Sequence, residues 1–255
     1  MTDAARQSRQ ESVMRVEVLA DVESVARYAA EVIAAEARSA VKARGRFAIA
    51  ISGGRTAWPM LRALSALDLP WADVHVMQVD ERIAPADHQD RNLTHLRANL
   101  LGGTHACPAQ IHAMPVESSN LDEAVARYVQ TLADVAGSPP VLDLVHLGLG
   151  TDGHTASLVP GDPVLDVMDA DVAVTGVYRR RRRMTLTYPA LNRARRVLWL
   201  VTGEAKKAML VRLLAADPAI PAGRVRQDHA LTLADGAAVW PRRQRRVAVD
   251  AVEGE

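Results

Sequence analysis

The stretch FAIAISGGRTAWPMLRAL, residues 47–64, decides the fold of this 255-residue chain. Its first five residues are a short apolar run, which predicts a buried strand, and the two glycines after them predict a tight turn. From about Thr56 the apolar residues follow helical spacing, and Pro59 falls in the first turn, where a helix tolerates proline. A strand, a glycine turn and a helix in this order are typical of a parallel α/β sheet.

The same alternation continues along the chain on both sides of this stretch. A strand is predicted at 14–20, followed by a helix that begins after Asp21 and ends at Gly45. Further strands are predicted at 74–79, 142–149 and 197–201, and further helices at 92–101, 120–136 and 204–216. We therefore expect an α/β fold with an open, mainly parallel twisted sheet flanked by helices, Rossmann-like in its right-handed connections. We also expect a flexible leader at 1–13, a single domain at 14–240 and a flexible tail at 241–255.

Composition and charge exclude several classes of protein. Cys107 is the only cysteine, which excludes a disulfide framework and a cysteine-rich metal site, and suits the reducing cytoplasm. No apolar run is long enough for a membrane span, and no His, Asp or Glu cluster has metal-ligand spacing, so we expect no membrane partner and no metal. A net charge of +1 argues against a general polyanion binder. The run of arginines at 179–183 has no interleaved aromatic residues to stack bases, so we expect no nucleic-acid partner.

Four groups of unusual residues each follow a predicted strand. Because the carboxyl ends of parallel strands share one edge of the sheet, these groups are expected to meet in a single crevice. They are Ser52-Gly53-Gly54, Asp80-Glu81-Arg82, the segment 148–154, and the Thr202-Gly203 turn before Lys206.

The loop from Ser52 to Thr56 is a candidate phosphate site. Gly53 and Gly54 allow close approach of the backbone, and the following helix offers unpaired N–H groups to an anion. The loop lacks the Walker A spacing, so a nucleoside triphosphate is not implied. Glycines that serve only the geometry of the turn are the alternative interpretation. Lys206, after a separate strand, supplies an ammonium group suited to a compact phosphate contact.

The segment at 148–154 is a candidate catalytic loop. Its three glycines match the dinucleotide fingerprint formally, but Pro160 and Pro163 leave no room for the helix that must follow, so we expect no nicotinamide or flavin cofactor. We expect the glycines instead to bend a loop that projects Asp152 and His154 into the crevice. A neutral imidazole accepts a proton near pH 7, which makes His154 the best candidate general base.

The segment Asp80-Glu81-Arg82 brings two carboxylates and a guanidinium to the same edge. Neighbours in an extended chain point to opposite faces, so Asp80 and Arg82 are expected to point the same way. A surface ion pair is the alternative interpretation.

Five segments, in order, resemble the 6-phosphogluconolactonases: residues 51–64, 78–92, 146–161, 183–210 and 220–225. The resemblance implies the open α/β fold that these enzymes share with glucosamine-6-phosphate deaminases and ribose-5-phosphate isomerases. It implies hydrolysis of 6-phospho-D-glucono-1,5-lactone to 6-phospho-D-gluconate in the oxidative pentose phosphate pathway, without a cofactor.

The same resemblance assigns roles to individual residues. His154 would be the base, and Asp80, a second catalytic candidate, would complete the sugar site with Arg82. Gly53, Gly54, Thr56, Lys206 and Arg183, or a neighbour of Arg183 in the arginine run, would surround the phosphate. The expected partner is a small sugar phosphate, bound by a monomer or weak homodimer.

Two alternatives stay open. An amino-sugar phosphate deaminase or aldose–ketose isomerase would use the same fold, but that family carries Asn-Glu-Pro shortly after its histidine, where this chain has Ser157-Leu158-Val159-Pro160. A non-enzymatic sugar-phosphate sensor would need a DNA-reading module, and the segment before the first strand is too short for a helix-turn-helix.

Overall fold

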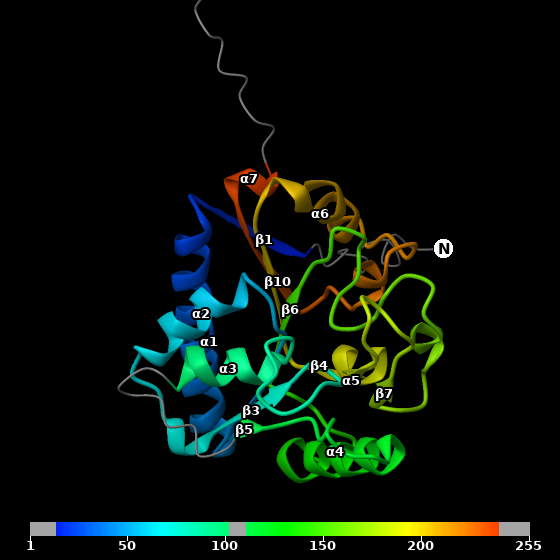
Figure 1. Ribbon diagram of the computed structural model, residues 1–255. Helices are drawn as coiled ribbons and strands as arrows, with labels where there is room; N and C mark the ends of the chain where they lie inside the picture. Colours follow the sequence, from blue (N-terminus) through cyan, green and yellow to red (C-terminus); the bar gives the residue numbers. More distant parts are fainter. Residues whose placement is uncertain (1–13, 102–110, 240–255) are drawn as a thin grey trace, which may run out of the picture.

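The computed structural model describes residues 14–101 and 111–239; the predicted leader and tail, and Cys107, lie outside these ranges. Within them, seven parallel strands form the main sheet in the order β1-β10-β9-β6-β2-β3-β5 (Figure 1). The strands are β1 Arg15–Leu19, β2 Phe47–Ile51, β3 Val74–Gln78, β5 Ile111–His112, β6 Leu144–Gly148, β9 Val197–Val201 and β10 Ala230–Asp235. The predicted open, parallel α/β sheet is therefore confirmed.

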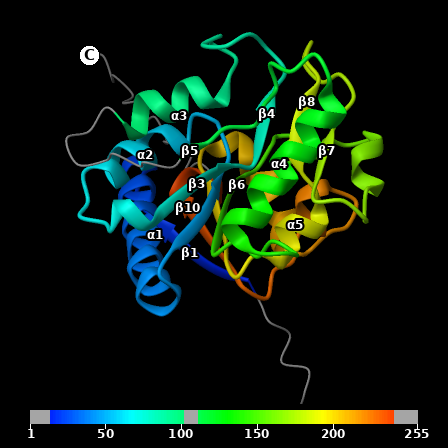
Figure 2. The same ribbon diagram turned by 90° about the horizontal axis from the view of Figure 1, so that it is seen from below.

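Helices cover both faces of this sheet. One face packs against α1 Val22–Arg44, α2 Ala57–Ser65 and α3 Asn92–Leu100, and the other against α4 Leu121–Ala136, α5 Tyr188–Arg193, α6 Lys207–Leu214 and α7 Gly236–Val239 (Figures 1 and 2). Strand β2 shows how the sequence serves both layers. Ile49 and Ile51 belong to the core beneath α1 and α2, whereas Ala48 and Ala50 belong to the core beneath α4. Because both faces are covered, the strand is apolar at every position, as parallel sheets require.

The predicted helix signals are present at the ends of α1 and α4. The carboxylate of Asp21 accepts a hydrogen bond from the Ser24 N–H at 2.7 Å, and Gly45 ends α1 in the left-handed conformation with a φ of 74°. At α4, the side chain of Asn120 accepts from the N–H of Glu123 and donates to its carboxylate. Satisfying the free backbone groups in this way fixes where each helix begins or ends.

A second, antiparallel sheet of three strands lies over the edge of the main sheet. It has the order β4-β8-β7, with β4 Asp80–Arg82, β7 Val172–Val174 and β8 Arg183–Leu186. In its register Asp80 pairs with Thr185, and Arg82 pairs with Arg183. We expected Asp80–Arg82 to be extended at the end of a strand, but the sequence predicted neither its pairing with another strand nor a strand at 183–186. Antiparallel pairing with a distant segment produces this order.

Short 3-10 turns complete the chain: η2 Trp71–Asp73, η3 Pro163–Asp166, η4 Glu204–Lys206 and η5 Pro221–Arg224. The prediction of one helix over 204–216 was wrong in its bounds. The segment starts as η4, continues as α6 and ends at Leu214. In the part of the chain that the structure describes, no helix is both long and apolar enough to cross a bilayer.

Candidate active site

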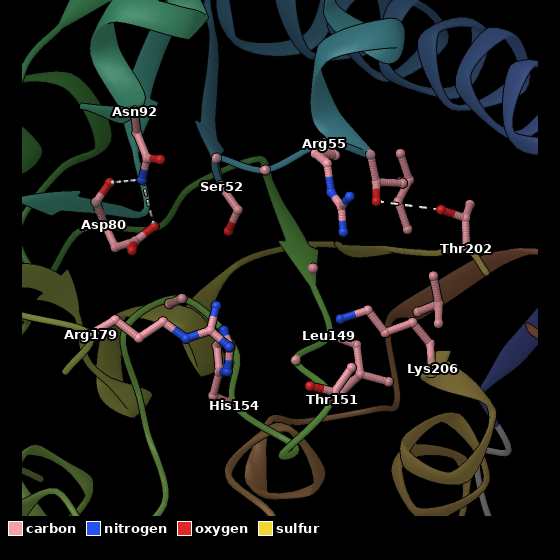
Figure 3. A pocket seen from close by; sticks show the side chains of 18 of the residues that line it. Ser52, Arg55, Asp80, Asn92, Leu149, Thr151, His154, Arg179, Thr202 and Lys206 are labelled. Atoms are coloured by element: carbon pink, nitrogen blue, oxygen red, sulfur yellow. Dashed lines mark hydrogen bonds between the residues drawn. The ribbon is translucent and has the colours of Figure 1, made fainter. Parts of the chain in front are cut away.

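A cavity of about 590 Å³ opens at the carboxyl edge of the main sheet, where the four predicted groups of residues meet (Figure 3). Nine of the ten residues predicted for the site line it, and Asp152 lies just behind them. The nine are Ser52, Gly53, Gly54, Thr56, Asp80, Arg82, His154, Arg183 and Lys206. The expectation that these strand ends share one crevice is therefore met.

His154 and Asp152 form a hydrogen-bonded pair on the loop after β6. The Nδ1 atom of His154 lies 2.5 Å from Oδ1 of Asp152, and the same oxygen accepts from the backbone N–H of His154 at 3.2 Å. Burial raises the pKa of Asp152, but the charge and hydrogen bonds of His154, with the Tyr178 hydroxyl, outweigh it and lower that pKa to about 2. The ionised carboxylate can only accept, so Nδ1 donates and Nε2 keeps its lone pair.

Burial also sets the charge of the imidazole. It lowers the pKa of His154 below the ordinary value of 6.5, against the opposing effect of Asp152 and with a further lowering from Arg183. His154 is therefore neutral at pH 7. A neutral, oriented imidazole beside a cavity is the arrangement that general-base catalysis needs.

The glycines of this loop make room for the pair. A Cβ on Gly150 would lie 2.1 Å from Nδ1 of His154 and 2.5 Å from Oδ1 of Asp152. Gly153 has a φ of 84°, and its Cβ would lie 2.7 Å from Cβ of Ile220. No helix follows within residues 149–162, in agreement with the rejection of a dinucleotide fingerprint.

Asp80 lies at the start of β4, on the same wall of the cavity as Arg82. Its Oδ2 accepts from the Ser157 hydroxyl at 2.6 Å, and its Oδ1 accepts from the Asn92 amide at 3.2 Å. Glu81 points away from the cavity, is fully buried and accepts from the backbone N–H groups of Asn92 and Leu93 at the start of α3. The expected alternation of side-chain directions along Asp80–Arg82 is confirmed. Glu81 binds the start of α3, while Asp80 and Arg82 face the cavity.

Two arginines bring positive charge to this wall. Arg183, only 6% exposed, donates weakly to the Ser157 hydroxyl at 3.4 Å and leaves its Nε without a hydrogen-bond partner. Arg82 donates to the carbonyl of Asp90 at 2.7 Å, and its Nε is likewise buried and unpartnered. Buried N–H groups without acceptors are costly, so they favour an anionic or hydroxyl-bearing ligand in the cavity.

The glycine loop between β2 and α2 lies beside Asn92 and Asp80 and faces His154 across the cavity (Figure 3). A Cβ on Gly53 would lie 1.9 Å from Oδ1 of Asn92, and Gly54 has a φ of 122°, so both positions require glycine. No side chain caps the start of α2, and although the N–H of Ala57 donates to the carbonyl of Gly54 and Pro59 has none, the N–H of Trp58 is left available to an anion. Figure 3 shows Arg55 and Lys206 extending into the cavity beside this loop.

Lys206 lies partly buried, near two arginines and Asp152. Burial lowers the pKa of Lys206; Asp152 raises it, and Arg55 and Arg179 lower it further. A bound anion would relieve the repulsion among these cations.

Several lining or supporting residues were not predicted as site residues. Asn92 lines the cavity, and Ser157 and Tyr178 support Asp80 and Asp152 from behind. Thr151 and Thr202, which belong to the predicted groups but were given no role, line the cavity as well. Asp152, predicted to meet the substrate, is absent from the lining and acts on His154 instead. Arg183 is the best placed of the arginine run, since it is buried on the cavity wall, and Arg179 is the second member of the run that reaches it.

Among residues 14–101 and 111–239, no three His, Cys, Asp or Glu side chains gather closely enough to hold a metal ion.

An open parallel sheet with a cationic glycine loop and a His–Asp pair at its carboxyl edge defines a sugar-phosphate enzyme of α/β type. The model of the family described as glucosamine-6-phosphate isomerases/6-phosphogluconolactonase matches residues 20–235. The chain belongs to this family.

Several relatives of this chain are named 6-phosphogluconolactonase. The chain is 37% identical over 231 residues to a 6-phosphogluconolactonase of Nostoc sp., covering 88% of this chain and 96% of that one. It is 38% identical over 210 residues to a 6-phosphogluconolactonase of Synechocystis sp., covering 80% and 87%. Among solved structures, a 6-phosphogluconolactonase from Shewanella baltica shares the fold with a TM-score of 0.79 at 24% identity, covering 87% of this chain and 97% of that one.

Proposed function

We propose that this chain hydrolyses 6-phospho-D-glucono-1,5-lactone to 6-phospho-D-gluconate, the lactonase step of the oxidative pentose phosphate pathway. The observation that carries the proposal is one cavity holding a neutral, carboxylate-oriented histidine and, across from it, a cationic glycine loop. The relatives named above, which bear this activity in their names, support the same assignment.

His154 is the general base of the proposed reaction. Its Nε2 takes a proton from water while the water oxygen forms a bond to the lactone carbonyl carbon. The carbonyl oxygen becomes an oxyanion, which the positive charge of Arg183 and Arg82 stabilises. Arg183, for which the resemblance implied a phosphate contact, is thus assigned to the carbonyl end of the substrate. When the tetrahedral intermediate collapses, the bond to the ring oxygen breaks, and the imidazolium returns its proton to that oxygen as it leaves as an alcohol.

The phosphate provides anchoring rather than chemistry. The N–H groups of the Gly53-Gly54 loop, Thr56 and Lys206 hold it on the far side of the cavity, so that the carbonyl is positioned near His154. Ser52, whose buried hydroxyl has no hydrogen-bond partner, is a further donor for this end of the substrate. Asp80 accepts from a sugar hydroxyl.

The deaminase and isomerase alternative is less well supported by the residues that follow His154. Ser157 is fully buried and donates to Asp80, and Leu158 and Val159 are buried apolar side chains. This segment therefore offers no carboxylate to hold the imidazole for ring opening, and Asp152 holds it from the other side.

We also propose that the enzyme works without metal, as a monomer or weak homodimer, in the reducing cytoplasm to which a single cysteine is suited.

The test is hydrolysis of the enzymatically generated phospho-lactone, with the spontaneous rate subtracted and D-glucono-1,5-lactone as the unphosphorylated control. The phospho-lactone should be the better substrate by about 100-fold in kcat/KM, because only it engages the loop and Lys206. Lys206→Met should remove about tenfold or more of that preference, mainly through KM, since a hydrogen bond to a charged group is lost. Equal turnover of the two lactones by the parent enzyme would contradict the phosphate site, and release of ammonia from glucosamine 6-phosphate would favour the alternative.

A further inference from the structure

Tyr178 contacts both members of the candidate catalytic pair, Asp152 and His154. No sequence motif predicted Tyr178 as a site residue. Its hydroxyl donates to Oδ2 of Asp152 at 2.9 Å, while the other oxygen of that carboxylate holds His154. Its ring packs edge-on against the imidazole of His154, with centroids 5.6 Å apart and planes at 64°. The carboxylate is thus held through both oxygens, and the imidazole is held by the bond to its nitrogen and by its contact with the Tyr178 ring.

The backbone of Tyr178 is itself firmly held. Tyr178 and Arg181 exchange both backbone hydrogen bonds across a two-residue turn, at 2.9 and 3.2 Å. The turn residues, Arg179 and Arg180, have φ values of 49° and 70°, which closes the hairpin tightly. The side chain of Arg181 pairs with Asp90 at 3.0 Å, so the hairpin is tied to the loop before α3.

The aromatic ring also organises positive charge at the cavity. The guanidinium carbons of Arg183 and Arg179 lie 5.0 and 5.1 Å from the centre of the Tyr178 ring, within the range of cation–π attraction. One side chain therefore touches the carboxylate, the imidazole and two cations that line the cavity. Its position is that of a support for the reacting groups rather than one of them, because Tyr178 is not among the residues that line the cavity.

We propose that Tyr178 is a positioning residue that fixes the Asp152–His154 pair and limits how strongly the carboxylate attracts a proton on the imidazole. The inference rests on the proposed function, in which His154 is the base. The hydroxyl withdraws negative charge from Asp152 through its hydrogen bond. Without it, the carboxylate stabilises the imidazolium more strongly, and His154 becomes protonated at a higher pH.

Other charged and titratable groups face the pair and remain in place when the hydroxyl is removed. Those groups are Asp80, Arg179, Arg183 and Lys206. Tyr178→Phe keeps the aromatic ring. The ring still shields His154 from water and still contacts the guanidinium groups of Arg179 and Arg183. The variant therefore isolates the bond to Asp152.

The experiment measures Tyr178→Phe in two ways. The acid limb of the kcat/KM profile should move to higher pH by about half a unit, and kcat at its plateau should fall about three- to tenfold because the pair is less well oriented. In the substrate-free protein, the NMR titration of His154 should show the same upward movement of its midpoint. Tyr28→Phe is the matched control: the nearby carboxylate of Glu17 raises the pKa of the Tyr28 hydroxyl, and neither residue lines the cavity. It should leave both measurements unchanged.

The two arms distinguish the failure of this inference from that of the proposed function. A parent protein without lactonase activity would contradict the function, while the NMR titration would still test the contact. A folded Tyr178→Phe protein with the parental His154 midpoint and the parental kcat would overturn the positioning role. A fall in kcat equal to that of Tyr28→Phe, with no movement of the midpoint, would overturn it as well.

Discussion

His154 is the single residue whose loss should cost the most activity. Replacement by Ala or Asn removes the proton acceptor but none of the phosphate contacts, so kcat should fall by about 10²- to 10⁴-fold with little change in KM. The acid limb of the parental profile should lie below pH 6.5, because burial lowers the pKa of His154 and keeps it neutral to lower pH. Steady-state kinetics from about pH 5 to 8 would check both. A folded variant with near-parental kcat would transfer the base role, and Asp80 would be the first residue to test.

Gly150 should tolerate no side chain, for a reason specific to catalysis. A methyl group on it would occupy the space of His154 Nδ1, so Gly150→Ala should displace the imidazole and lower kcat by about 100-fold or more. Gly148→Ala, at the end of β6, is the matched control, because its Cβ would meet no atom within 4 Å. That variant should keep the parental His154 NMR signal, and any loss of kcat/KM should come from a higher KM rather than a lower kcat. An unchanged His154 signal in Gly150→Ala would contradict the steric argument.

The residues that sequence reasoning found, and those it missed, differ in how their positions are determined. His154 and Lys206 follow strands, and the rule that parallel strand ends share an edge places them together without knowledge of the tertiary structure. Ser157, Asn92 and Tyr178 act through partners far away in the chain, such as the contact between Ser157 and Asp80. No local pattern encodes such a contact, so the supporting residues emerge only from the fold.

At the scale of elements, Asp143 joins the start of β6 to two others. Its Oδ2 accepts from the backbone N–H of Ala48 in β2 at 2.9 Å, and its Oδ1 accepts from Arg44 at the end of α1 at 2.7 Å. Asp143→Ala would leave a buried N–H without an acceptor and should lower the free energy of unfolding by about 1–3 kcal/mol. This end of the sheet is opposite the cavity, so kcat should stay parental. Denaturant unfolding and kinetics on the same sample would check this, and a large fall in kcat of the folded variant would contradict it.

The main strands and helices were predictable because their signals are local: apolar runs, N-caps and glycine stops. The antiparallel sheet was not, since β4 has only three residues and pairs with β8, about a hundred positions later. Its segment Asp80-Glu81-Arg82 is charged throughout, and although we expected it to be extended, nothing in that pattern indicates which strand it pairs with. The pairing is nonetheless what brings Arg82 beside Arg183 on the cavity wall.

For the molecule as a whole, His146 should make folding stability depend on pH. It lies in the middle of the main sheet, fully buried, with both ring nitrogens unpartnered, and burial lowers its pKa from 6.5 to about 4. Between about pH 4 and pH 6.5, His146 therefore binds a proton in the unfolded chain but stays neutral in the folded protein. The free energy of unfolding consequently falls as the pH drops through this range. His146 alone should cost about 2 kcal/mol between pH 7 and pH 5, and His146→Leu should remove that part of the dependence. Denaturant unfolding at both pH values measures it; equal pH dependence in the two proteins would contradict it.

The strand order of the main sheet also constrains when the molecule can be completed during synthesis. β1 is an edge strand whose only neighbour in the sheet, among the described strands, is β10, with Arg15 opposite Leu231. A ribosome adding residues at about 5–20 per second leaves β1 unpaired for roughly 10 to 40 s before β10 exists. Arg15 and Glu17 place charged side chains on β1 while it is unpaired. Charged side chains on an unpaired strand discourage its pairing with other nascent chains. Of the described strands, the first one made is thus among the last to be hydrogen-bonded.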